Sequence, residues 1–172
     1  FHSDQCYVER PCMAAMLYAM EIPSHGGHTL FANMYKAYET LPESLKQRLA
    51  GMTALNVYDY DNSPVKRGPT RADAPQCSQP IFRTHPATGK KALYVNRLMT
   101  VSIDGMVRDE SDRILQQLFD HAENPDWIYE HPWRLNDLLM WDNRCTTHAR
   151  TDFDPGERRK MRRAVVLGEK PY

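Results

Sequence analysis

Short apolar runs separated by proline, glycine and charged residues dominate the chain. The longest run, 12–22 (CMAAMLYAMEI), lies between Pro11 and Pro23. Its length would permit a helix, but prolines at both ends favour a buried strand. Further runs rich in β-branched or aromatic residues predict strands at 52–60, 80–84, 92–96, 127–133, 137–141 and 160–167. A turn over 86–89 would join the second and third of these.

Helical patterns are fewer and shorter. We predict helices over 32–40 and 42–51, where Pro42 is tolerated in a first turn and Gly51 ends the pattern. The clearest helix is 110–122, with one apolar face formed by Ile114, Leu115, Leu118, Phe119 and Ala122. The segment 61–80 contains four prolines and many charges, and we interpret it as a mobile loop long enough to act as a lid.

Composition narrows the class of protein. A length of 172 residues suits one domain with a sizeable core. Lys+Arg and Asp+Glu both number 22, so the balanced charge favours neither nucleic acid nor an anionic membrane as a partner, and no apolar run approaches a membrane span. The four cysteines form no CxxC pair, which indicates a reducing cytoplasm rather than a disulfide framework.

The many short strands predict a mainly β sandwich or jelly roll, with a few helices at its edges. We expect a single domain, 1–172. The first motif begins at His2 with no supporting strand before it, so we also expect this domain to lack its N-terminal portion.

Histidines and a carboxylate occur at opposite ends of the chain. His2 and Asp4 are separated by one residue, and on a strand their Cα atoms would lie roughly 7 Å apart on the same face. His148 would supply a third ligand from a distant strand. Two histidines and one carboxylate form a non-haem iron site with open coordination positions. Taken alone, the His2–Asp4 pair is weak evidence, and a surface histidine with a capping aspartate is the more common explanation of such a pair.

A basic run near the end of the chain carries a second signal. If 159–165 is a strand, Arg159 and Arg163 share one face, about 13 Å apart. Burying two guanidinium groups is costly unless each meets an anion, such as a carboxylate or sulfonate bound bidentately. The alternative is a solvated basic edge strand that prevents edge pairing.

Several segments occur together in an order typical of one enzyme family: His2-Ser3-Asp4, Gly26-Gly27-His28-Thr29-Leu30-Phe31-Ala32-Asn33-Met34, Arg83-Thr84-His85-Pro86, Ala92-Leu93-Tyr94-Val95-Asn96 and Trp141-Asp142-Asn143-Arg144. With His148 and the basic run, the chain resembles the taurine dioxygenase family. This family of iron(II)- and 2-oxoglutarate-dependent oxygenases includes the 2,4-dichlorophenoxyacetate dioxygenases. The resemblance implies a double-stranded β-helix (jelly roll) with flanking helices.

The resemblance also implies roles for individual residues. His2, Asp4 and His148 would be the catalytic iron ligands. Thr29 and Arg159 match positions that bind the distal carboxylate of 2-oxoglutarate, and Arg163 matches the position that binds the anionic group of the substrate. Trp141 is expected to pack beside the site rather than react.

Two positions bear on which reaction and substrate to expect. The carboxylate of Asp4 favours oxygen insertion over halogenation, because related halogenases have a small residue there. Met99 replaces an aromatic pocket residue of taurine-cleaving members, which makes taurine itself a poorer candidate.

We therefore expect a dioxygenase that uses Fe(II), 2-oxoglutarate and O2 to hydroxylate a small organic anion. The substrate would be a sulfonate, a sulfate ester or a carboxylate, with C–S or C–O cleavage when the hydroxylated carbon carries the leaving group. Two other hypotheses remain: a non-catalytic metal- or ligand-binding jelly roll, and a zinc hydrolase. The sequence identifies neither the substrate nor the oligomeric state; a homo-oligomer is one possibility.

Overall fold

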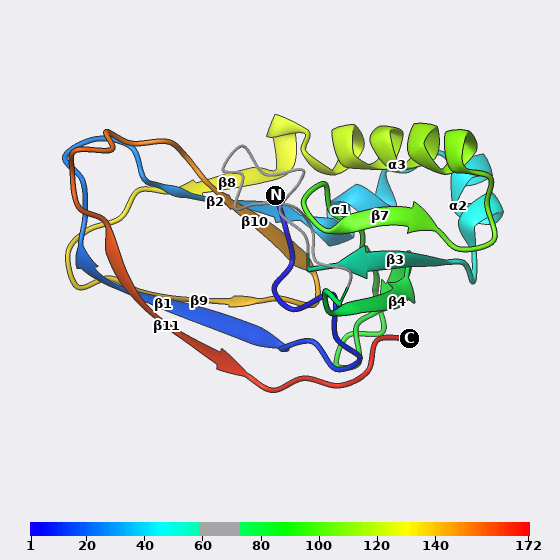
Figure 1. Ribbon diagram of the computed structural model, residues 1–172, viewed down its shortest axis with the longest axis horizontal. Coiled ribbons are helices and arrows are strands. Elements are labelled where there is room, and N and C mark those ends of the chain that lie inside the picture. The colour runs from blue at the N-terminus through cyan, green and yellow to red at the C-terminus, as the bar shows by residue number, and fades with distance from the viewer. Residues whose placement is uncertain (59–72) are drawn as a thin grey trace.

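Two three-stranded antiparallel sheets face one another in the computed structural model, which describes residues 1–58 and 73–172 (Figure 1). The first sheet has the order β11-β1-β9, formed by Lys160–Val166, Ala14–Glu21 and Leu138–Asp142. The second has the order β10-β2-β8, formed by Thr146–Arg150, Thr29–Asn33 and Ile128–His131. Strands distant in sequence are thus neighbours in both sheets, and the predicted mainly β jelly roll is confirmed.

The face of the first sheet that looks toward the second is set by the alternation of β1. Ala15 lies opposite Trp141 of β9, and Trp141 packs against Phe31 of β2 with ring centroids 5.2 Å apart. Leu17, two residues after Ala15, shares this inner face and lies opposite Arg163 of β11. The register therefore directs Arg163 toward the space between the sheets.

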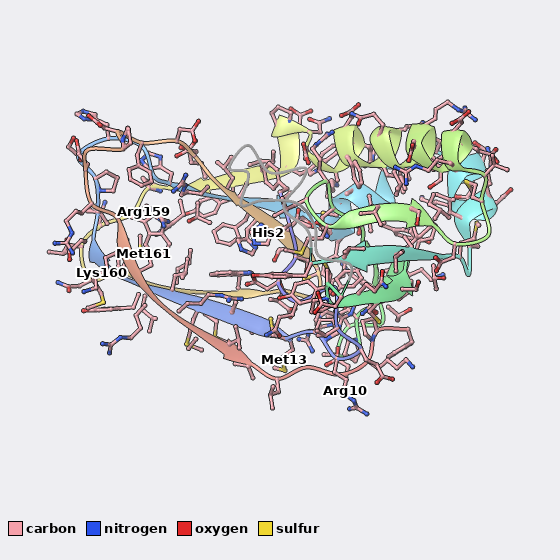
Figure 2. The ribbon with its side chains drawn as sticks, in the orientation of Figure 1. His2, Arg10, Met13, Arg159, Lys160 and Met161 are labelled. Carbon is pink, nitrogen blue, oxygen red and sulfur yellow. The ribbon has the colours of Figure 1, made fainter. Side chains whose placement is uncertain are left out.

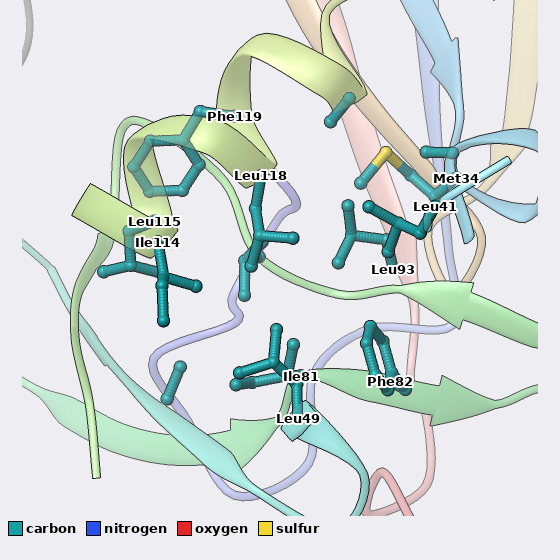
Figure 3. Packing of buried hydrophobic residues seen from close by; sticks show 14 of the residues in the cluster. Met34, Leu41, Leu49, Ile81, Phe82, Leu93, Ile114, Leu115, Leu118 and Phe119 are labelled. Atoms are coloured by element: carbon teal, nitrogen blue, oxygen red, sulfur yellow. The ribbon is translucent and has the colours of Figure 1, made fainter. Parts of the chain in front are cut away.

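A second region beside the jelly roll contains the larger hydrophobic core (Figures 1 and 3). Its strands are β4-β3-β7 (Gln76–Pro80, Thr53–Val57, Thr100–Ile103) and the hairpin β5-β6 (Phe82–Thr84, Lys91–Leu93). Its helices are α1 (Met34–Glu39), α2 (Glu43–Leu49), α3 (Arg108–Ala122) and the 3-10 turn η1 (Pro125–Trp127). The predicted apolar face of α3 is buried in this core.

Some predicted boundaries are wrong by a few residues. The helix predicted from residue 32 begins at Met34, because Ala32 and Asn33 end strand β2. Asn33 caps the helix instead, since its side chain accepts a hydrogen bond from the backbone N–H of Lys36. The strand predicted over 92–96 ends at Leu93, and the short strand β7 was not predicted.

The C-terminal boundary of the loop predicted over 61–80 is wrong. Gln76–Pro80 forms β4, which pairs with β3 from Thr53↔Pro80 to Val57↔Gln76. Pro80 is tolerated because β4 lies at the edge of its sheet. Residues 61–72 of the predicted loop, and 59–60 of the strand predicted before it, lie outside the described residues. Among the helices that are described, none is long and apolar enough to span a membrane.

Candidate active site

Three predicted ligands meet between the two sheets of the jelly roll. The ligand atoms of His2, Asp4 and His148 all lie within 4.8 Å of one another. Nε2 of His2 is 3.6 Å from one carboxylate oxygen of Asp4, and Nε2 of His148 is 3.9 Å from the other. Figure 2 shows His2 in the space between the sheets. The fold therefore brings together groups that are up to 146 positions apart in the sequence.

Backbone pairing places the two histidines opposite each other. The N–H of His2 donates to the carbonyl of His148 at 2.9 Å, and the N–H of His148 donates back at 2.8 Å. Their ring centroids are 4.1 Å apart. The prediction that His2 and Asp4 share a strand is wrong, because His2 forms an isolated bridge and Asp4 begins a turn.

The charge states of Asp4 and His148 suit a cation. Burial alone would raise the pKa of Asp4, but its interactions with His2, His148 and Arg163 outweigh burial and hold this pKa at about 2. Burial and the neighbouring His2 lower the pKa of His148 to about 3. At neutral pH the site thus offers an ionised carboxylate and a neutral imidazole, the forms that bind metals.

Arg163 reaches the same site. One of its terminal nitrogens lies 2.8 Å from a carboxylate oxygen of Asp4. Its side chain is 47% exposed, so the expectation that this guanidinium is buried is wrong. Strand β11 lies at the edge of its sheet, which leaves the arginine open to solvent on one side.

Arg159 precedes β11 by one residue and is half-buried. Its Nε donates to the carbonyl of Gly27 at 2.8 Å, and it forms no ion pair within the described residues. Burial and the nearby Arg150 lower the pKa of Arg159. An incoming anion would offset this burial cost.

Gly27 allows this approach. It has a positive φ of 65°, and a Cβ atom there would lie 3.1 Å from the side chain of Arg159. Thr29 follows two residues later, is 3% exposed, and accepts a hydrogen bond from the indole N–H of Trp133 at 2.9 Å. With its oxygen engaged, the hydroxyl of Thr29 can donate its proton to an anion. No pattern in the sequence pointed to a role for Trp133.

Met99 lies in a buried cluster with Cys6 and Tyr94, and Tyr7 packs against that cluster. Its sulfur is 3.6 Å from the thiol of Cys6, and the residue is 4% exposed. Its role in a substrate pocket stays a prediction. Trp141 packs as predicted, with its ring centroid 4.8 Å from that of His148.

A second cluster, His85, Asp142 and Cys145, also brings possible metal ligands together. Asp142, however, is bound by Arg144 through two hydrogen bonds of 2.9 and 2.7 Å, and by Nε2 of His85 at 3.0 Å. Nδ1 of His85 faces two backbone N–H groups of the following turn. Because its lone pairs are occupied, this cluster connects β9 to the turn after β5 rather than offering a metal site.

Comparisons with known proteins identify the family of the chain. Residues 1–165 match the model of the family described as "Taurine catabolism dioxygenase TauD, TfdA family". The chain is 34% identical to the alpha-ketoglutarate-dependent 2,4-dichlorophenoxyacetate dioxygenase of Burkholderia sp. (strain RASC), over 99% of this chain and 58% of that relative. The chain therefore spans little more than half the length of this relative.

Two solved structures have the same fold. The crystal structure of AAD-2 in complex with Mn(II) and N-oxalylglycine superposes with a TM-score of 0.91 at 32% identity, covering 99% of this chain and 69% of that one. A taurine dioxygenase from Burkholderia xenovorans gives 0.88 at 28% identity, covering 99% of this chain and 57% of that one. The family match extends over nearly the whole chain, and so the chain belongs to the TauD/TfdA family of dioxygenases.

Proposed function

We propose that this chain forms the catalytic region of an iron(II)- and 2-oxoglutarate-dependent dioxygenase that hydroxylates a small organic anion. The observation that carries the proposal is the convergence of His2, Asp4 and His148 within 4.8 Å. Two imidazoles and one carboxylate suit a non-haem iron that keeps coordination positions open. The activities of similar proteins, a 2,4-dichlorophenoxyacetate dioxygenase and a taurine dioxygenase, support this proposal.

The residues of the site fit a divalent cation. One carboxylate oxygen of Asp4 is buried and has no hydrogen-bond partner among the described residues, although the group is ionised at neutral pH. Arg163 pairs with the other oxygen, so this one is left for a cation to bind. Bound by His2, Asp4 and His148, iron(II) together with 2-oxoglutarate and O2 would supply the oxidising power that converts a substrate C–H bond into C–OH.

The cosubstrate would be held by Arg159 and Thr29. The half-buried guanidinium of Arg159 lacks an ion-pair partner in the described structure. Gly27 accepts its hydrogen bond, and Thr29, two residues after Gly27, offers a hydroxyl donor. A distal carboxylate is the partner that these two donors lack. Their part is to orient 2-oxoglutarate, not to react with it.

The primary substrate would be bound through Arg163. This guanidinium lies beside Asp4, so an anionic group that it binds stays close to the metal ligands. Sulfonates, sulfate esters and carboxylates all fit a planar guanidinium. Where the hydroxylated carbon carries a sulfonate or an ether oxygen, the product would break down with C–S or C–O cleavage. Met99 would shape the apolar side of this pocket.

Metal binding tests the site without turnover. Mn(II) should bind to the protein under anaerobic conditions, and 2-oxoglutarate should bind only after the metal. His148→Ala should weaken Mn(II) binding by more than about 100-fold, beyond the 10- to 100-fold typical of outer-shell changes. Equal Mn(II) affinity in the variant and the parent would contradict the proposal. A cytoplasmic setting, in which the four cysteines stay as free thiols, remains a prediction.

A further inference from the structure

Asp4 differs from the two histidines in how its backbone is held. His2 and His148 hold each other through paired backbone hydrogen bonds. Asp4 lies in a turn, outside any strand, and the residue after it, Gln5, has a positive φ of 59°. A turn of this kind is strained for a non-glycine residue and needs support from its surroundings.

The main support comes from Asn143, which directly follows β9 and is fully buried. The thiol of Cys12 makes only a long contact of 3.9 Å with the carbonyl of Asp4. Oδ1 of Asn143 accepts a hydrogen bond of 2.9 Å from the backbone N–H of Asp4. Its Nδ2 donates to the backbone carbonyl of Asp4, also at 2.9 Å, and to the carbonyl of Cys12 at 2.9 Å. The amide thus binds both backbone groups of Asp4, as a neighbouring strand would.

Ser3 reinforces this arrangement. Its hydroxyl lies 3.1 Å from the carbonyl of Asn143 and 3.2 Å from Oδ1 of the same residue. The backbone N–H of Asn143 in turn donates to the carbonyl of Met13 at 2.9 Å. Asn143 therefore connects the turn at Asp4 to the start of β1 and the end of β9, and its donors and acceptors are used nearly to capacity.

We propose that Asn143 is the positioning residue for the Asp4 ligand, a role that rests on the proposed metal site. Its amide replaces the strand partner that Asp4 lacks, and so it fixes the direction of the carboxylate relative to His2 and His148. Only an amide offers a donor and an acceptor at this spacing. In Asn143→Asp a carboxylate would face the carbonyls of Asp4 and Cys12, and in Asn143→Ala both bonds to Asp4 disappear.

The test measures two quantities for each variant. Mn(II) affinity is obtained from the loss of the paramagnetic resonance signal of free Mn(II), and stability is obtained from unfolding by denaturant. Asn143→Ala and Asn143→Asp should weaken Mn(II) binding by about 10- to 100-fold, as changes in outer-shell partners do. Asn56→Ala is the matched control. Asn56 is equally buried and hydrogen-bonded, but its partners are Thr100 and Ala54 in the other region. The Asn56→Ala variant should be less stable than the parent. Its Mn(II) affinity should stay within about twofold of the parent's, a change smaller than the contribution of one hydrogen bond.

Two results would overturn the inference: folded Asn143 variants that bind Mn(II) as the parent does, or an equal loss in Asn56→Ala. Asn143→Asp preserves the side-chain volume and decides the question if the alanine variant does not fold. If neither folds, Ser3→Ala decides it, since loss of that hydroxyl should weaken Mn(II) binding by about 2- to 10-fold. Failure of the proposed function gives a separate result, because Asp4→Ala would then bind Mn(II) as tightly as the parent.

Discussion

Arg159 and Arg163 are four positions apart, yet their surroundings differ. Arg159 is held by the carbonyl of Gly27 and has no acidic partner in the described structure. Arg163 lies against Asp4 and is open to solvent. A guanidinium that is held only by a neutral carbonyl can still form an ion pair with a small anion. A guanidinium beside the proposed metal ligands can instead contact a substrate that binds next to the metal. We therefore assign the first to the cosubstrate and the second to the substrate.

Exchanging each arginine separately tests this assignment. Arg159→Ala should raise the KM for 2-oxoglutarate by about 10- to 100-fold, because a charged hydrogen-bonded contact contributes about 1.5–3 kcal/mol. Arg163→Ala should instead raise the KM for the anionic substrate by a similar factor. Steady-state succinate formation measures both values. The assignment is wrong if Arg163→Ala raises only the requirement for 2-oxoglutarate.

At the scale of elements, one strand at the edge of the second sheet contacts the proposed cosubstrate site. Trp133 follows β8 and reaches across to β2, where its indole N–H binds the hydroxyl of Thr29. Both residues are buried, so this bond fixes which way the hydroxyl donates. If Thr29 binds 2-oxoglutarate as proposed, the position of β8 beside β2 would affect that binding.

Removing only the indole N–H tests this contact. Trp133→Phe should raise the KM for 2-oxoglutarate by about 2- to 10-fold, the effect of one neutral hydrogen bond, and leave the substrate KM unchanged. Trp127→Phe is the control, because that indole donates to the carbonyl of Ala122 at 3.2 Å, away from Thr29. Equal effects of the two variants would show that lost packing, not the bond to Thr29, is responsible.

The end of β9 is braced by ionic contacts that respond to pH. Burial alone would raise the pKa of Asp142, but its bonds to Arg144 and His85 hold this pKa at about 2. The ordinary value is 3.8, so the carboxylate stabilises the fold above about pH 4 and loses this contribution as the pH falls toward 2.

Denaturant unfolding of the parent and of Asp142→Asn between pH 2 and pH 6 measures this contribution. The parent should be the more stable protein above about pH 4, and the difference in the free energy of unfolding should shrink steadily in more acidic solution. A difference that stays constant or grows as the pH falls would refute the assignment.

At the scale of the whole molecule, the jelly roll brings His2 and Asp4, early in the chain, together with His148, late in the chain. Alternation along β1 and β11 is a local property, which is why the inward direction of Arg163 could be predicted from spacing. The bridge between His2 and His148, and the bonds from Asn143 to Asp4, join residues about 140 positions apart, and no local pattern reports them. The spacing of His2 and Asp4 suggested that both lie on one strand. That spacing contains no information about Asn143, whose side chain replaces the strand partner of Asp4.

Composition misled in the same way at Gln76–Pro80. Prolines and charges across 61–80 indicated a loop, yet pairing with β3 makes Gln76–Pro80 a strand, at the edge of its sheet where proline is tolerated. Tertiary pairing thus overrides local propensity where the partner strand is distant in sequence.

The most direct test of the central claim is succinate formation from 2-oxoglutarate, measured after anaerobic loading with iron and addition of O2, with a panel of sulfonates, sulfate esters and aryloxy acids. We predict succinate that requires both iron(II) and O2, rises with at least one anion of the panel, and disappears in His148→Ala. Zinc should not replace iron. Metal binding without any oxygen-dependent succinate would contradict the account and favour a jelly roll that binds ligands without turnover, and hydrolysis with zinc would favour a hydrolase.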